Sequence, residues 1–376
     1  MILDESRGWI YGSDSTGNKI DVISTTTLEL VKSFALVNGA APKGISLSPD
    51  GSELAIAQNG AGSILFLNPD TGATVATTSH YKSGDVVFGR AGRLYSMASA
   101  NNSGSIHVID TTTHAIISTS GFSVYSGGHL ALSSDKNTLF INDATSSHTI
   151  YKFDVSTDTL PNPRRAGKAR YPASYLLLAD NKLFIDTGQV WSSELNAQIG
   201  SFSAAGYLTE IPGRQWVAVI SKTTPGLVTF VKTTDYYTAS TYTIASVGTV
   251  GRGVASSDGN TLYVNTQNGI KVVDLQALVP TPPNHPTPVI YFDMVLDESR
   301  GWIYGSDSDG NKIDVISTTT QELVKSFVLV NGATPKGIAL SPDGSELAVA
   351  QNGASSLLFL NPDTGVTIAT IIPNVY

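Results

Sequence analysis

Basic and aromatic side chains stand in the polar segments before several apolar runs of this sequence, and together they could bind an anion. Cationic groups attract carboxylates and phosphates, and an aromatic ring beside them offers an apolar surface to a sugar or a small organic molecule. The residues of this kind are Lys43, Tyr81, His129, Arg170, Tyr171, Arg252 and Lys336. The alternative is that they are ordinary solvated surface residues, which is the default position of lysine and arginine.

Other site chemistry has less support in the sequence. The six histidines are spread along the chain without the paired spacing of metal ligands, and the absence of cysteine excludes thiolate metal sites, iron–sulfur clusters and a cysteine nucleophile. Residues 307–311 (DSDGN) resemble a calcium loop, but the matching residues 14–18 (DSTGN) lack the central acid, so we interpret both as hairpin turns. No nucleophile elbow, P-loop or dinucleotide fingerprint opens a helix. We therefore predict no metal and no cofactor.

The charge balance limits the classes of partner. The chain has 376 residues, of which 23 are Lys or Arg and 31 are Asp or Glu, and its formal net charge is -8. A nucleic-acid surface needs a concentrated basic field, so we expect no nucleic-acid partner. No apolar run approaches the roughly 18 residues that span a bilayer, so we expect no membrane insertion.

The sequence contains internal repeats, so a repeated structural unit must position the residues discussed so far. Residues 1–77 recur at 294–370 with 66 identical positions, and most of the 11 differences exchange small or apolar residues. Beneath this duplication lies a weaker period of about 42 residues. Its clearest marker is a short apolar run at 9–11, 54–56, 94–96, 139–141, 183–185, 216–218, 262–264, 302–304 and 347–349. The marker indicates nine units.

Each unit has the pattern of four β-strands. Short runs rich in Val, Ile, Leu, Tyr and Phe alternate with clusters of Gly, Asp, Asn and Ser, and no long stripe of helical period competes with them. Turn residues fall between the first and second runs, as in SPDG at 48–51 and 341–344, and between the third and fourth, as in NPDTG at 68–72. Unit 5, from residue 175 to about 210, is short and lacks a clean first turn.

A four-stranded unit of this size cannot bury both of its faces, so successive units must stack, and radial stacking gives a β-propeller. We predict an all-β fold of four-stranded antiparallel blades in a single propeller over residues 1–376. The approximate blades are 1–43, 44–84, 85–128, 129–173, 174–210, 211–252, 253–292, 293–336 and 337–376.

Two ring closures are compatible with nine units. One is a nine-bladed ring; the other is a seven-bladed ring followed by two blades of a tandem copy. The proline-rich segment 279–288 (VPTPPNHPTP) stands between units 7 and 8, where a linker would support the second closure. We favour nine blades, because two surplus blades would expose large apolar faces and sheet edges.

The repeats resemble a known family. Residues 42–57 (PKGISLSPDGSELAIA) with 63–68 (SILFLN), and residues 257–265 (SDGNTLYVN), are similar to the YVTN-type repeat of prokaryotic surface-layer-like propellers. The resemblance covers units 1 to 3 and 7 to 9, and weakens in units 4 to 6. It implies a secreted or cell-surface bacterial protein, whose signal or anchor is not present in this chain.

Two functions follow as hypotheses. The first is a non-catalytic, monomeric scaffold that binds a protein, a glycan or an anionic small molecule at the mouth of the axial channel. The second is a lactonase- or lyase-like enzyme with its site in that channel, because propellers similar to this one carry such sites. An enzyme of that kind needs histidine and carboxylates at one mouth, and only His129 is well placed.

Overall fold

The computed structural model describes residues 1–79, 82–98, 104–124, 129–142, 149–168, 175–245, 247–278, 291–320, 322–330 and 332–372. Every regular element in these ranges is a β-strand, and the strands form nine antiparallel sheets. Eight sheets have four strands and the seventh along the chain has three. The predicted all-β class and the nine four-stranded units are confirmed, with this one three-stranded exception. None of the described ranges contains a helix long and apolar enough to cross a membrane.

The first four blades follow the repeats closely. Blade 1 contains β1 (Ile2–Asp4), β2 (Trp9–Asp14), β3 (Lys19–Ser24) and β4 (Leu30–Ala35). Blade 2 contains β5 (Pro42–Leu47), β6 (Leu54–Gln58), β7 (Ser63–Leu67) and β8 (Thr74–Ser79). Blade 3 contains β9 (Ser83–Phe88), β10 (Arg93–Ala98), β11 (Ile106–Asp110) and β12 (Ile116–Thr119). Blade 4 contains β13 (Leu130–Leu132), β14 (Thr138–Asn142), β15 (Thr149–Asp154) and β16 (Arg164–Lys168).

The remaining blades have the same strand order. Blade 5 contains β17 (Leu176–Ala179), β18 (Lys182–Ile185), β19 (Gln189–Ser192) and β20 (Gln198–Ser201). Blade 6 contains β21 (Gly206–Ile211), β22 (Trp216–Ser221), β23 (Leu227–Lys232) and β24 (Thr238–Thr243), and blade 7 contains β25 (Val250–Ala255), β26 (Thr261–Thr266) and β27 (Gly269–Asp274). Blade 8 contains β28 (Met294–Asp297), β29 (Trp302–Asp307), β30 (Lys312–Ser317) and β31 (Leu323–Val328). Blade 9 contains β32 (Pro335–Leu340), β33 (Leu347–Gln351), β34 (Ser356–Leu360) and β35 (Thr367–Ile371).

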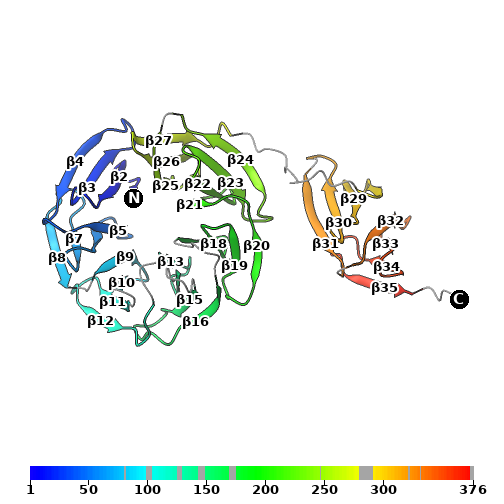
Figure 1. Cartoon of the computed structure of the whole chain (residues 1–376), viewed down its shortest axis with the longest axis horizontal. Coiled ribbons are helices and arrows are strands. Elements are labelled where there is room, and N and C mark those ends of the chain that lie inside the picture. Colours follow the sequence, from blue (N-terminus) through cyan, green and yellow to red (C-terminus); the bar gives the residue numbers. More distant parts are fainter. Residues whose placement is uncertain are drawn as a thin grey trace. The chain divides into compact units, whose positions relative to one another are not determined.

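Blades 1 to 7 form one compact unit, Met1–Pro280, and blades 8 and 9 form a second, Thr281–Tyr376. Within the first unit the blades follow one another around a circle, and β25 of blade 7 contacts β1 of blade 1 (Figure 1). The backbone N–H of Ser257 in blade 7 donates a 2.7 Å hydrogen bond to Oε1 of Glu5 in blade 1. The first unit is therefore a closed seven-bladed ring.

This closure corrects the single nine-bladed ring that the sequence led us to favour. Nine blades are present, but they are divided seven and two, as in the alternative that the proline-rich segment supported. The argument for nine blades assumed that no apolar blade face stays exposed. The structure instead leaves apolar side chains of the second unit exposed, among them Met294 and Leu296.

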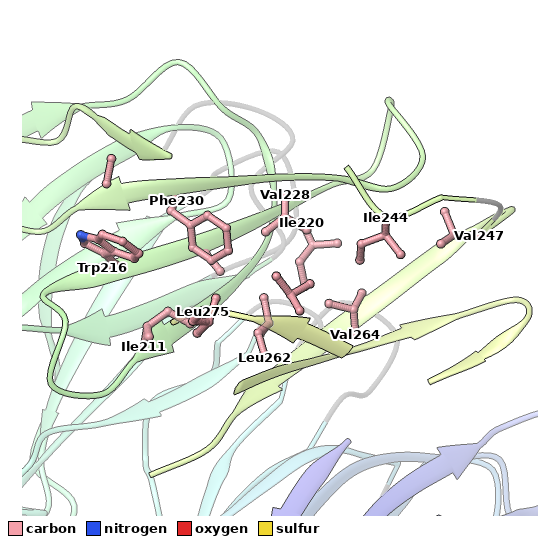
Figure 2. Packing of buried hydrophobic residues seen from close by; sticks show 13 residues of the cluster. Ile211, Trp216, Ile220, Val228, Phe230, Ile244, Val247, Leu262, Val264 and Leu275 are labelled. Carbon is pink, nitrogen blue, oxygen red and sulfur yellow. The ribbon is translucent and has the colours of Figure 1, made fainter. Parts of the chain in front are cut away.

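Apolar packing between successive blades forms the core of the ring. Figure 2 shows the contact of blades 6 and 7, where Ile220 and Phe230 point toward Leu262 and Val264. These four side chains are at most 1% exposed. Successive side chains of a strand point to opposite faces, so each central strand supplies apolar residues to the blade on either side.

The turns predicted from SPDG are present in both units. Ser48 Oγ donates a 2.6 Å hydrogen bond to Asp50 Oδ1, and the backbone N–H of Glu53 donates one back to Ser48 Oγ. Gly51 has a φ of 71°, in the left-handed region that favours glycine. Ser341 and Asp343 repeat the first bond in blade 9.

Blade 5 has a regular turn between its first and second strands, which the sequence analysis did not find. Asp180 and Asn181 join β17 to β18, with φ angles of 48° and 55°. Two successive left-handed residues match a type I′ hairpin turn, and Asp and Asn are among the residues that tolerate it. The signal for this turn was the Asp-Asn pair between two apolar runs.

We predict that deleting residues 294–376 leaves the ring intact, because blade 7 already packs on blade 1. The truncated protein should show the same melting transition as the ring in the full chain, within about 2 °C, by scanning calorimetry. Light scattering during gel filtration should show no aggregate. A truncated protein that aggregates or melts at a much lower temperature would show that blades 8 and 9 contribute to the ring.

Candidate functional site

A cavity of about 340 Å³ lies where the first strands of the seven ring blades converge. It is lined by residues of β1, β5, β9, β13, β17, β21 and β25 or by residues that immediately precede these strands. A larger cavity of about 790 Å³ lies beside it between blades 1 and 7, and Met1 and Arg252 line both. Convergence of first strands on the axis thus brings together residues that are far apart in sequence.

Four residues from four different blades form what we call the axial cluster: Asp85, His129, Tyr175 and Arg252. Nδ1 of His129 lies 2.6 Å from Oδ2 of Asp85, although the ring is not oriented for a well-aligned hydrogen bond. The imidazole stacks on the ring of Tyr175 with 4.1 Å between centroids. The guanidinium of Arg252 lies 4.5 Å from the centroid of the same Tyr175 ring. Tyr175 therefore connects the two basic members of the cluster.

Asp85 is held by the backbone of two blades. Its Oδ2 accepts a 3.0 Å hydrogen bond from the N–H of Leu130 in blade 4, and its Oδ1 accepts one of the same length from the N–H of Val86. Burial alone would raise the pKa of Asp85, but His129, Arg252 and the Leu130 N–H outweigh it, so the pKa lies below the ordinary value. Asp85 is thus a buried carboxylate with a structural role between blades 3 and 4.

The second unit contains the same arrangement without the histidine. Asp293 Oδ2 accepts a 3.0 Å hydrogen bond from the N–H of Ile338 in blade 9, and Asp293 Oδ1 accepts one from the N–H of Met294. The residue before Ile338 is Gly337, in the place that His129 holds before Leu130. A carboxylate at this position therefore joins two blades whether or not a histidine contacts it.

The charged and aromatic groups of the cavity lining are two cations, Lys43 and Arg252, two acids, Asp85 and Glu210, and the rings of His129 and Tyr175. Lys43 lies on its lining and is exposed, while Tyr175 is buried, and burial raises the pKa of the Tyr175 phenol. Glu210 also lines the cavity, and burial together with the charge of Asp180 raises its pKa.

The structure brings together three of the predicted site residues, Lys43, His129 and Arg252. Tyr81, Arg170 and Tyr171 lie outside the described residues. Lys336 belongs to the second unit, where its Nζ lies 4.8 Å from the centroid of the Phe292 ring, so its assignment to the channel mouth of the ring is corrected. The assignment assumed one ring for all nine blades.

Sequence analysis missed Asp85 and Tyr175. A signal for Asp85 was available, because Asp85 and Asp293 occupy the same place at the start of a first strand in blades 3 and 8. Tyr175 gave no such signal. Its contact with His129 and Arg252 depends on how blades 4, 5 and 7 are rotated about the axis.

Comparison with known proteins agrees with the fold. No protein-family model and no curated protein matches the chain. Among solved structures, the chain resembles U3-55K with a TM-score of 0.58 and 14% identity, over 73% of this chain and 94% of that one. The WD40 repeats of RRP9 align with a TM-score of 0.57 and 14% identity over 74% and 93% of the two chains.

A chain of the Mitotic Checkpoint Complex is similar with a TM-score of 0.56 and 14% identity, over 69% of this chain and 82% of that one. At such low identity these likenesses show the fold alone. They place the chain structurally with the β-propellers. The axial cluster is a feature of this chain's own residues.

We predict that Asp85→Ala destabilises the ring by about 2–5 kcal/mol, because it leaves two backbone N–H groups without their acceptor and removes the charge beside His129. Chemical denaturation followed by tryptophan fluorescence measures the change. Asp293→Ala is the matched control, since it removes the same backbone acceptor from the second unit and should leave the ring transition unchanged. Equal effects of the two substitutions on the ring would contradict the assignment.

Proposed function

We propose that the seven-bladed ring is a non-catalytic scaffold that binds an anionic group of a protein, glycan or small molecule at the axial cavity. The observation that carries the proposal is the arrangement of Lys43, His129, Tyr175 and Arg252 around one cavity. Three of these residues carry or can carry positive charge, and the fourth offers an aromatic surface.

One acid of the cavity is already engaged within the protein. Asp85 accepts two backbone hydrogen bonds and contacts His129. The chain as a whole carries a net charge of -8. Two cations gathered at one cavity of an acidic protein favour an anion at that place over the surface in general.

A protein partner with an acidic segment is the first choice among these ligands. A propeller presents a rigid ring of loops around its axis, and one structural neighbour is a chain of a multiprotein complex, the Mitotic Checkpoint Complex. Its likeness to this chain suggests that a ring of this shape serves as an interaction surface. The ligand chemistry comes from the axial cluster.

We further propose a secreted or cell-surface location in a bacterium, which the resemblance of residues 42–57 and 257–265 to surface-layer-like repeats supports. Fractionation of cells that express the natural protein tests it. Recovery with the envelope or the medium would agree with the proposal, and a purely cytosolic pool would contradict it.

We predict that Lys43→Gln and Arg252→Gln each weaken the binding of an acidic ligand about tenfold, which corresponds to the loss of one charge-assisted contact. An oligosaccharide of uronic acids serves as the probe in calorimetry, beside the same oligosaccharide with its carboxyl groups reduced. An aspartate-rich peptide tests the protein class in the same way.

Lys336→Gln is the matched control, because Lys336 is the duplicate of Lys43 in the second unit. It should bind both probes like the unchanged chain. Equal binding of the acidic and reduced probes, or an equal effect of the control substitution, would show that the axial cavity is not an anion site.

The second candidate function is a lactonase- or lyase-like activity, and the 2.6 Å approach of His129 to Asp85 favours it. A carboxylate beside an imidazole can hold the base in one tautomer for proton transfer. The hydrogen bond that the Leu130 N–H donates to Asp85, repeated at Asp293 in the second unit, accounts for the carboxylate without catalysis. Turnover of a model lactone that is lost in His129→Gln would establish the enzyme; an unchanged rate would exclude a role for His129.

A further inference from the structure

The two-bladed unit exposes apolar side chains that its duplicate in the ring keeps covered. Ala57 and Phe66 of blade 2 are 0% exposed, because they pack against blade 3. Their identical counterparts in blade 9 are exposed Ala350 and half-buried Phe359. Ser46 is 7% exposed, whereas its counterpart Ala339 is exposed. One face of blade 9 is therefore a packing surface without a neighbour within its unit.

The opposite end of the same unit shows a second uncovered face. Met294 and Leu296 on β28 of blade 8 are 59% and 51% exposed. They hold the positions that Val86 and Phe88 hold on β9 of blade 3, because Asp85 and Asp293 precede them with the same backbone bonds. Val86 and Phe88 are 4% and 8% exposed.

The contact between blades 2 and 3 in the ring shows how these two faces fit each other. Blade 2 contributes Ala55, Ala57, Ile64 and Phe66, and blade 3 contributes Val86, Phe88, Leu94 and Ile109. Blade 9 has the first set as Ala348, Ala350, Leu357 and Phe359. Blade 8 has the second set as Met294, Leu296, Ile303 and Ile316, by the same strand register.

We propose that blade 9 of one chain stacks on blade 8 of a second copy of this chain. Each half of the new interface is an apolar surface whose counterpart is buried in the ring, and small alanines of one face again meet larger side chains of the other. Covering exposed apolar area provides the driving force.

The contact is head to tail, because the two faces differ. Contacts of this type either close into a ring or continue as a filament. Propellers typically have four to eight blades, so closure gives four, six or eight blades from two, three or four copies. This proposal replaces the monomer that the sequence analysis expected.

Two polar contacts of the template are lost. The backbone N–H of Phe88 donates a 3.1 Å hydrogen bond to Ser46 Oγ in the ring, and Ala339 has no hydroxyl to accept the equivalent bond. Thr78 Oγ1 donates to the carbonyl of His114, and the counterpart of Thr78 is Ile371. The apolar side chains therefore make the larger part of the contact between copies. We expect association that depends on protein concentration and tolerates high salt, because salt screens charges and leaves apolar burial intact.

Sedimentation velocity of the full chain, from about 1 to 100 µM, tests the proposal. The unchanged chain should form species of two to four copies as concentration rises. Ala350→Glu and Met294→Glu should each raise the concentration needed by at least about tenfold, because a carboxylate would be buried without a partner. Val330→Glu is the control, since it adds the same charge at an exposed position between β31 and β32 and should change nothing.

A second measurement does not depend on disrupting the unit. The chain has no cysteine, so single thiols can be introduced cleanly. A bismaleimide reagent should link Ala350→Cys to Leu296→Cys in an equal mixture, and neither variant should link to itself to a similar extent. A chain that remains monomeric at 100 µM, or an oligomer in which these two thiols do not link, would overturn the proposal.

Discussion

Each blade of this protein is a four-stranded sheet with apolar side chains on both faces, and its stability depends on packing against a blade on each side. In the ring this requirement is met seven times, through contacts such as those of Ile220 and Phe230 with Leu262 and Val264. The ring closes through the same packing between blades 7 and 1, together with the hydrogen bond that the Ser257 N–H donates to Glu5. The two-bladed unit meets the requirement once and leaves a face uncovered at each end.

The site depends on the same stacking. First strands converge on the axis, so a residue just before or within each first strand can meet residues of blades that are more than 40 positions away. The axial cluster uses this geometry: Asp85, His129, Tyr175 and Arg252 come from blades 3, 4, 5 and 7. Asp85 shows how structure and site share a residue, since the carboxylate that contacts His129 also accepts the Leu130 N–H of the next blade.

The duplication provides an internal comparison that separates these roles. Asp293 keeps the backbone bonds of Asp85 without a histidine, so the carboxylate is explained by blade packing. His129, Tyr175 and Arg252 have no counterpart in the second unit, since blades 8 and 9 duplicate only blades 1 and 2. Those three residues are therefore where ligand recognition by the ring should be sought.

The sequence by itself determined the number of blades and most of their strands and turns, because alternating apolar residues and SPDG-type turns act within a few positions of one another. The first turn of blade 5 and the three-stranded blade 7 are the exceptions. It also identified Lys43, His129 and Arg252, since each stands at or just before the first strand of its blade. It could not determine which blade faces close on one another. Blades 1 and 8 have nearly the same residues, so local pattern could not decide which of them packs on blade 7. Ring curvature, which is a property of the stacked sheets, decided that closure and the meeting of Tyr175 with His129.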